Sequence, residues 1–373
     1  MSSDRPYEAF ARFAPPLHAC DPLRAAITAL HRRPEPDCVP PLARAAQVDA
    51  ETRAAIAATA RQLVERLRAA HRPGGVQALV QEFSLSSREG VALMCLAEAL
   101  LRIPDDATRD ALIRDKLAGG DWQAHLGSGR SLFVNAATWG LVLTGKLAAS
   151  VDDSGLAASL TRLVARLGEP VVRRGVDVAM RLMGEQFVTG QTIAEALANA
   201  RSREARGYGF SYDMLGEAAA TAEDAAAYCA AYKAAILAIG AASAGRGVHG
   251  GPGISIKLSA LHPRYARAQA DRVMAELLPR LRDLALLARS HDMGLNIDAE
   301  EADRLELSLN LLEALALDPE LAGWDGLGFV VQAYQKRCPA VIDWIVALAR
   351  RSGKRIMVRL VKGAYWDAEI KRA

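Results

Sequence analysis

Several features that define common protein classes are scarce in this 373-residue sequence. Its five cysteines are scattered and include no Cys-x-x-Cys pair, which argues against a disulfide framework and against a structural zinc site. No uninterrupted apolar run reaches the ~18 residues of a membrane span, and the N-terminal segment lacks the apolar core of a signal peptide. We therefore expect a cytoplasmic protein that is at most peripheral at the inner face of a membrane.

An excess of charge of one sign is also missing. The sequence has 46 Lys and Arg residues against 43 Asp and Glu residues, which leaves a formal net charge of +3. So small an excess lacks the basic footprint of nucleic-acid-binding proteins, and we expect no nucleic-acid partner. A Gly-x-Gly-x-x-Gly run at 245–250 follows a predicted helix and precedes a predicted strand, which is the reverse of the order in a dinucleotide-binding fingerprint.

The length of the sequence predicts two or three domains. The first forty residues are rich in proline and are predicted to form an irregular or partly extended arm. Apolar residues recur at helical spacing over 49–70, and further helical patterns follow up to residue 149. We expect an arm with a long helix over 1–66, a helical domain over 67–190 and a region of βα units over 191–373.

The last region alternates short apolar runs with amphipathic helical patterns, which is typical of βα units and a parallel sheet. The five predicted strands are 209–215, 253–258, 294–298, 328–332 and 356–361. The four predicted helices between them are 222–242, 266–290, 302–315 and 340–350. Each interval between strands is long enough for one crossover helix.

Polar side chains follow four of the predicted strands: Lys257, Asp298, Gln332 and Lys362. In a (βα)8 barrel, the carboxyl ends of the strands converge on one active-site mouth. A doubly wound sheet also places its site at the carboxyl ends, so the pattern predicts an α/β enzyme without separating these two folds.

The residues alone leave several roles open. Lys257 fits a Schiff-base nucleophile, a cation that binds a carboxylate, or a rim residue paired with an acid such as Asp298. Arg359 lies among apolar residues, and a buried guanidinium there needs an acid or an electron-rich ligand as partner. Asp213 and Glu217 flank the end of the first predicted strand, where they could pair with Arg or Lys.

Longer motifs carry a resemblance to a known family. They are Tyr212–Glu217 (YDMLGE), Lys257–Tyr265 (KLSALHPRY), Asn296–Asp303 (NIDAEEAD), Gly328–Arg337 (GFVVQAYQKR) and Arg359–Asp367 (RLVKGAYWD). In this order they resemble the strand-end motifs of the proline dehydrogenase domain of bifunctional proline utilisation A flavoenzymes. Met183–Phe187 (MGEQF) resembles the same family, and the helical first half resembles the family's N-terminal arm and α-domain.

This resemblance implies a (βα)8 TIM-like barrel, preceded by an all-α arm and helical domain, that holds FAD and oxidises L-proline to Δ1-pyrroline-5-carboxylate. The implied partners are L-proline and a membrane quinone that receives the electrons, and a homo-oligomer is compatible with the family. The implied catalytic residues are Lys257 for the proline carboxylate, Asp298 as its orienting partner beside the flavin, and Arg359 near the reactive flavin nitrogen.

Further site residues are implied in the same way. The substrate contacts, besides Lys257, are Ala364, Tyr365 and Glu217, the last as the acid of a gating ion pair. The flavin contacts are Asp298, Ala299, Val330, Gln332, Arg359, Val361, Lys362, Gly363, Ala364, Tyr365 and Trp366.

The chain departs from the family in length, because only five of eight expected strands are present. We expect a truncated barrel that is inactive alone as a proline dehydrogenase. Two other hypotheses stay open: a Schiff-base lyase that uses Lys257 or Lys362 on the same barrel, and a non-catalytic assembly fragment based on the helical first half.

Overall fold

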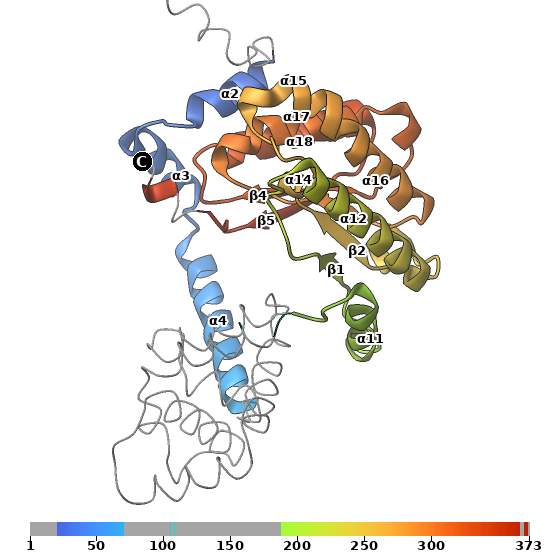
Figure 1. Ribbon diagram of the computed structural model, residues 1–373. Helices are drawn as coiled ribbons and strands as arrows, with labels where there is room; N and C mark the ends of the chain where they lie inside the picture. Colours follow the sequence, from blue (N-terminus) through green and yellow to red (C-terminus); the bar gives the residue numbers. More distant parts are fainter. Residues whose placement is uncertain (1–20, 71–104, 106–107, 109–187, 366–368, 372–373) are drawn as a thin grey trace, which may run out of the picture. The chain divides into compact units, whose positions relative to one another are not determined.

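The computed structural model describes residues 21–70, 105, 108, 188–365 and 369–371, and the helical patterns predicted between 76 and 149 lie almost entirely outside these residues (Figure 1). The chain divides into two compact units. The first consists of Met1–Gln47 and Thr192–Ala373, and the second of Val48–Gln191. The predicted site residues all belong to the first unit.

The first unit contains a five-stranded parallel sheet. Its strands are β1 (Ser211–Asp213), β2 (Gly253–Ile256), β3 (Leu295–Ile297), β4 (Leu327–Gln332) and β5 (Met357–Val361). Each strand pairs with the next one along the chain, in the order β1-β2-β3-β4-β5. Because a doubly wound sheet reverses its strand order at a switch point and a barrel does not, this order is that of a partial (βα)8 barrel. The predicted fold class is therefore confirmed.

Helices connect the strands along one side of the sheet (Figure 1). The segments that precede β3 are α11 (Ile193–Glu204), α12 (Ala222–Ser243), α13 (Gly247–Gly250), α14 (Leu258–Leu261), η2 (Arg267–Gln269), α15 (Ala270–Arg272), the π-helical η3 (Val273–Leu277) and α16 (Leu278–Ser290). Those that follow β3 are η4 (Ala302–Arg304), α17 (Leu305–Ala316), η5 (Pro319–Leu321) and α18 (Cys338–Ser352).

Local sequence signals explain where these helices begin and end. The capping box of Thr221 and Asp224 starts α12, and Gly353, at a φ of +65°, ends α18 in the left-handed conformation that favours glycine.

The single helix predicted over 266–290 is divided in the structure into four helical segments, η2, α15, η3 and α16. Pro279 has no amide hydrogen to donate to the carbonyl of Ala275, and the π-helical turn η3 precedes this proline.

Alternate residues of the central strands form the core between the sheet and the helices. Ile254, Ile256, Leu295, Ile297 and Phe329 are fully buried on this side. The helix α12 is also long and apolar enough to cross a membrane, but residues such as Tyr232, Ile236 and Ile239 bury one side of it in the same core. The residues between these apolar positions point to the other face of the sheet, where the predicted site lies.

The prediction of an irregular or partly extended arm over the first forty residues is wrong for residues 22–30 and 35–40, which belong to two helices, α2 (Pro22–Leu30) and α3 (Glu35–Ala45). Pro22 and Pro36 lie in first turns, where an α-helix needs no amide hydrogen from its residues. The side chain of Asp21 caps α2 by accepting a hydrogen bond of 2.9 Å from the amide of Leu23. In this segment, proline residues therefore lie at the starts of helices and do not only interrupt them.

Tertiary contacts also hold α2 in place. Ile27 is fully buried, and the buried guanidinium of Arg24 lies 3.1 Å from Glu306 Oε2 of α17 and 5.0 Å from the ring centroid of Trp344 of α18. The indole of Trp344 donates a 3.2 Å hydrogen bond to the side chain of Asp21. These long-range contacts cannot be read from local composition.

In the second unit, the predicted long helix is confirmed as α4 (Ala50–Ala70). The side chain of Asp49 accepts a 2.7 Å hydrogen bond from the amide of Thr52 at the start of this helix. The apolar positions Ile56, Leu63 and Leu67 on α4 are exposed.

Candidate functional site

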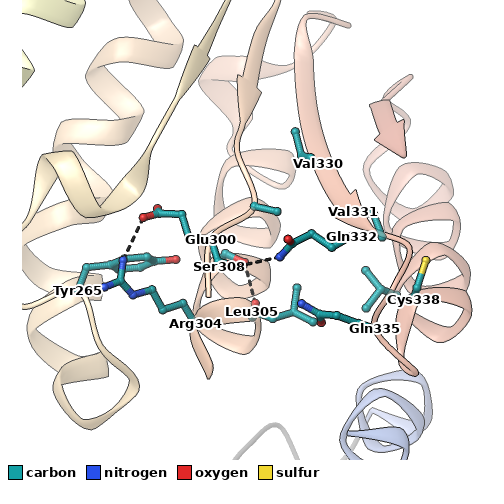
Figure 2. Close-up of a pocket in the computed structure, with 12 residues that line it drawn as sticks. Tyr265, Glu300, Arg304, Leu305, Ser308, Val330, Val331, Gln332, Gln335 and Cys338 are labelled. Atoms are coloured by element: carbon teal, nitrogen blue, oxygen red, sulfur yellow. Dashed lines mark hydrogen bonds and ion pairs between the residues drawn. The ribbon is translucent and has the colours of Figure 1, made fainter. Parts of the chain in front are cut away.

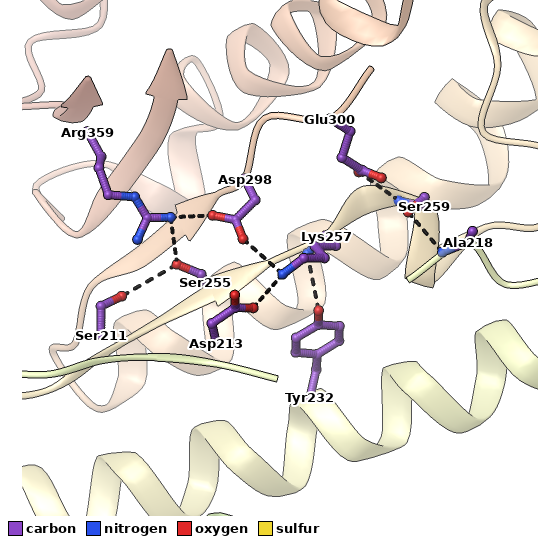
Figure 3. Close-up of polar contacts among 10 residues, drawn as sticks. All are labelled: Ser211, Asp213, Ala218, Tyr232, Ser255, Lys257, Ser259, Asp298, Glu300 and Arg359. Carbon is purple, nitrogen blue, oxygen red and sulfur yellow. Dashed lines mark hydrogen bonds and ion pairs between the residues drawn. The ribbon is translucent and has the colours of Figure 1, made fainter. Parts of the chain in front are cut away.

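Four charged side chains of alternating sign form a row at the carboxyl ends of the strands (Figure 3). Lys257, which follows β2, lies with Nζ 2.5 Å from Asp213 Oδ1 of β1 and 3.2 Å from Asp298 Oδ2, which follows β3. The other oxygen of Asp298 accepts a hydrogen bond from the guanidinium of Arg359 on β5. The structure therefore joins all three predicted catalytic residues in one chain of ion pairs, with Asp213 at its end.

This arrangement keeps the ammonium group of Lys257 protonated. Burial alone would lower the pKa of Lys257, but the hydrogen bond and charge of Asp213, followed by those of Asp298, raise it above its ordinary value. For Asp298, burial raises the pKa of the carboxyl, and the charges of Lys257 and Arg359 oppose that shift. A protonated lysine can bind an anion, whereas a Schiff-base nucleophile must first lose its proton.

Hydroxyl groups that the sequence analysis missed support the charged row. Ser255 is fully buried and accepts a 3.2 Å hydrogen bond from Arg359 Nη2, and its hydroxyl lies 3.4 Å from that of Ser211. The hydroxyl of Tyr232 on α12 accepts a 3.1 Å hydrogen bond from the amide of Lys257, and burial raises the pKa of Tyr232 to about 12. Ser255 lies two residues before Lys257, so alternation along the strand could have identified it, whereas no local signal marks Tyr232.

A second group of hydrogen bonds is centred on the buried side chain of Gln332, at the end of β4. Its Nε2 donates to the carbonyl of Glu300 over 2.8 Å, and its Oε1 accepts from the amide of Ala364 over 3.1 Å. The carboxylate of Glu300 accepts a 3.0 Å hydrogen bond from the amide of Ser259 and lies 3.0 Å from Arg304 Nη1. Gln332 thus links the loop after β3 to the loop after β5.

A cavity of about 20 Å³ lies beside this group, with room for about one water molecule (Figure 2). Ala299, Glu300, Val330 and Gln332 are among the residues that line it. Burial raises the pKa of the Glu300 carboxyl above its ordinary value. Ala299, Val330 and Gln332 are predicted flavin contacts, whereas no sequence motif assigns a role to Glu300.

The backbone after β5 is fixed against the end of β4. The carbonyls of Val361 and Lys362 accept hydrogen bonds of 2.8 and 3.1 Å from the amides of Ala333 and Tyr334. Gly363 has a φ of +118°, and a Cβ atom there would collide with the ring of Tyr334. Glycine is therefore needed at this position both for its conformation and for the close approach of the ring.

Tyr365 and Glu217 complete the set of predicted substrate contacts. Tyr365 is half-buried, and its pKa is raised to about 12 by burial first and then by the charge of Glu217. Glu217 is exposed and forms no ion pair with any described residue, so its gating partner stays a prediction. Trp366 lies outside the described residues.

One expectation about the charged row is wrong. Arg359 was predicted to be buried, but its side chain is 43% exposed because β5 is an edge strand of the described sheet. Of the two kinds of partner that the sequence leaves open for Arg359, an acid or an electron-rich ligand, the structure shows an acid, Asp298. The exposed part of the guanidinium leaves donors free for a ligand on the polar face.

Sequential parallel strands with a cation–carboxylate row at their carboxyl ends define part of a βα-barrel enzyme domain. Three family models match this chain, and they identify which family of βα-barrel enzymes it resembles. A model described as "Proline dehydrogenase" matches residues 196–373, one described as "Proline utilization A proline dehydrogenase N-terminal domain" matches residues 21–68, and one described as "DNA-binding domain of Proline dehydrogenase" matches residues 75–187.

Individual relatives cover the whole chain. It is 64% identical over 375 residues to "Bifunctional protein PutA" of Klebsiella aerogenes, covering 100% of this chain and 29% of that protein. It is 66% identical over 364 residues to the protein of that name in Rhizobium meliloti, covering 98% of this chain and 29% of that protein. A crystal structure of a proline utilization A variant from Bradyrhizobium japonicum matches 97% of this chain and 34% of that chain, with 45% identity and a TM-score of 0.61.

The chain therefore belongs to the proline dehydrogenase family, in the form found in proline utilization A (PutA) proteins. It spans about 29% of the length of the curated PutA relatives that it matches. Because the description of one matching model refers to DNA binding, the expected absence of a nucleic-acid partner, which rests on net charge, stays a prediction.

Proposed function

We propose that this chain forms part of the site at which a flavin-dependent proline dehydrogenase oxidises L-proline to Δ1-pyrroline-5-carboxylate. The single observation that carries this proposal is the row of ion pairs that holds Lys257 at the carboxyl ends of the strands between Asp213 and Asp298 and links it through Asp298 to Arg359. Membership of the proline dehydrogenase family supports the choice of proline as the substrate.

On the substrate side, Lys257 binds the carboxylate of proline. An ammonium group has three N–H donors, and the two acids that contact Lys257 leave one donor for a ligand. Apolar contact with the proline ring is assigned to Ala364 and Tyr365, on the loop that Gln332 and Tyr334 hold in place. Glu217 lies close enough to Tyr365 to raise its pKa, which supports a place for this acid at the edge of the substrate site.

The residues around β4 and β5 fit a flavin, which would accept a hydride from the proline ring. Val330 offers a buried apolar surface, the free donors of Arg359 lie next to it in the register of β4 and β5, and Gln332 keeps one amide hydrogen and one lone pair unused. Gly363 lets the ring of Tyr334 approach the backbone closely, which fixes the loop after β5 beside these residues. A fixed cation such as Arg359 favours added electron density nearby, which suits FAD.

The Schiff-base lyase is less well supported. Such an enzyme needs a neutral lysine, and the two carboxylates around Lys257 raise its pKa instead.

In the proposed proline dehydrogenase, the electrons taken from proline would pass from the flavin to a membrane quinone. The protein would then lie in the cytoplasm, at most peripheral to the inner face of the membrane. The near-neutral net charge of +3 supports a role without nucleic acid.

Because the 373 residues are expected to be inactive alone, the test uses the full-length protein that the gene encodes, loaded with FAD and mixed with L-proline and an electron-accepting dye. The expected result is proline-dependent dye reduction with Δ1-pyrroline-5-carboxylate as the product, trapped with o-aminobenzaldehyde. Absence of that product, together with borohydride-dependent attachment of a carbonyl substrate to Lys257, would replace this function with the lyase.

A further inference from the structure

The loop between β1 and α12, residues 214–221, carries Glu217 on a strained backbone. Gly216 has a φ of +118°, and a Cβ atom there would collide with the ring of Tyr228 on α12. Ala218 has a φ of +56°, in the left-handed region that residues other than glycine rarely adopt. Such a conformation costs free energy, and it persists only where the surroundings of the residue fix it. The place of Glu217, between these two positions, therefore depends on what holds its neighbours.

Ser259 supplies two contacts that hold this loop (Figure 3). Its hydroxyl accepts a 3.0 Å hydrogen bond from the amide of Ala218. Its carbonyl accepts a second hydrogen bond, also of 3.0 Å, from the amide of Ala219. One residue thus fixes the loop at the strained position that directly follows Glu217.

Ser259 is itself held in place. It is only 2% exposed and lies on α14, which begins directly after Lys257. Its amide donates a 3.0 Å hydrogen bond to the buried carboxylate of Glu300. The loop that carries Glu217 is therefore tied to the same strand end that positions Lys257.

We infer that Ser259 is a positioning residue, which holds Ala218 and Ala219 and thereby fixes the carboxylate of Glu217 at the edge of the substrate site. The charge of Glu217 contributes to the raised pKa of Tyr365, which agrees with this location. The inference rests on the proposed function for the role of the site. It goes beyond that function because Ser259, which is not among the proposed substrate or flavin contacts, is given an effect on substrate affinity through Glu217.

A double-mutant cycle separates positioning from a general structural role. The full-length protein, loaded with FAD, is prepared as wild type, Ser259→Ala, Glu217→Gln and the double variant, and proline oxidation is measured at a series of proline concentrations. In Ser259→Ala the KM should rise about fivefold, roughly the loss of one hydrogen bond, while kcat changes by less than about twofold. In the Glu217→Gln background the same substitution should leave the KM unchanged, because the carboxylate through which Ser259 acts is gone.

Hydrogen exchange of peptides that cover residues 214–221 measures the loop without any reaction. In Ser259→Ala, the amides of Ala218 and Ala219 should exchange at least about fivefold faster. Ser259→Thr keeps the hydroxyl, and the open cavity of about 410 Å³ that Ser259 lines has room for the added methyl group. The control Ser243→Ala removes another fully buried serine hydroxyl, one without a hydrogen-bond partner among the described residues. Both variants should exchange, and oxidise proline, as the wild type does.

Three results would overturn the inference: unchanged exchange of the loop in Ser259→Ala; an unchanged KM in that variant; or an equal rise in KM with and without the Glu217 carboxylate, as a purely structural role of Ser259 predicts. Far-UV circular dichroism verifies that each variant is folded. If the wild type does not oxidise proline, the proposed function falls. The exchange rates then decide the inference by themselves, and it stands if Ser259→Ala loosens the loop while Ser243→Ala does not.

Discussion

The two faces of the five-stranded sheet are made by the same strands but carry opposite chemistry. On the helix side, Ile254, Ile256 and Phe329 are fully buried among apolar side chains. On the other side, Lys257 and Arg359 are joined through the shared acid Asp298 and keep donors for a ligand. Because side chains alternate along a strand, one face can stabilise the fold while the other carries charges whose burial opposes stability.

We expect the largest loss of stability from a substitution on the helix face of the sheet. Phe329→Ala removes a fully buried ring from the central strand β4, and we expect the free energy of unfolding to fall by about 3–5 kcal/mol. Urea unfolding followed by circular dichroism measures this change. A loss below about 1 kcal/mol would show that the helix face does not hold the sheet together.

On the polar face, Lys257→Met should affect ligand binding more than folding. The charged hydrogen bond to the proline carboxylate is worth about 1.5–3 kcal/mol, so we expect proline binding to weaken by about 10–100-fold. Folding should change little, because Asp298 keeps Arg359 as a partner and Asp213 is half-exposed. Unchanged proline affinity, measured by the concentration dependence of oxidation, would contradict the role of this cation.

Burial of the Glu300 carboxyl should make the stability of the fold depend on pH. Its pKa is raised by burial, so the folded state binds more protons than the unfolded state between the ordinary value of 4.5 and the raised value. The free energy of unfolding should therefore fall as pH rises through this window, and Glu300→Gln should remove that fall. Urea unfolding at a series of pH values tests this, and identical slopes in the two proteins would refute it.

The smallest effect is expected at the edge of the sheet. Leu360 on β5 is 57% exposed, and Leu360→Ala should change the free energy of unfolding by no more than about 0.5 kcal/mol. This variant is also the matched control for Phe329→Ala, because both shorten an apolar strand residue. A loss as large as that of Phe329→Ala would mean that this edge is covered by other parts of the protein.

Much of the sheet could be predicted from the sequence because its signals are local. Short apolar runs that end in Lys257, Asp298 and Gln332 marked both the strands and the polar ends that form the site. The same runs did not distinguish a barrel from a doubly wound sheet, because both folds place polar residues there. The order of the strands, which the structure supplies, separates them.

Features that depend on distant contacts could not be predicted. Burial of Arg359 was expected from its apolar neighbours in sequence, but exposure is set by the position of β5 at the edge of the sheet. Tyr232 and Glu300 reach the site from α12 and from the loop after β3, and the sequence carries no spacing that links them to Lys257 or Gln332. The helices of the proline-rich segment likewise depend on packing of Arg24 against α17 and α18.

The most direct test of the account is anaerobic titration of the FAD-loaded protein with L-proline, followed by the visible flavin absorbance, in the wild type and in Lys257→Met. We expect proline to bleach the flavin of the wild type, and to bleach the retained flavin of the variant only at about 10–100-fold higher proline concentrations. Bleaching at the same proline concentrations in both proteins, or none in the wild type, would contradict the assignment of the polar face as a proline-oxidising site.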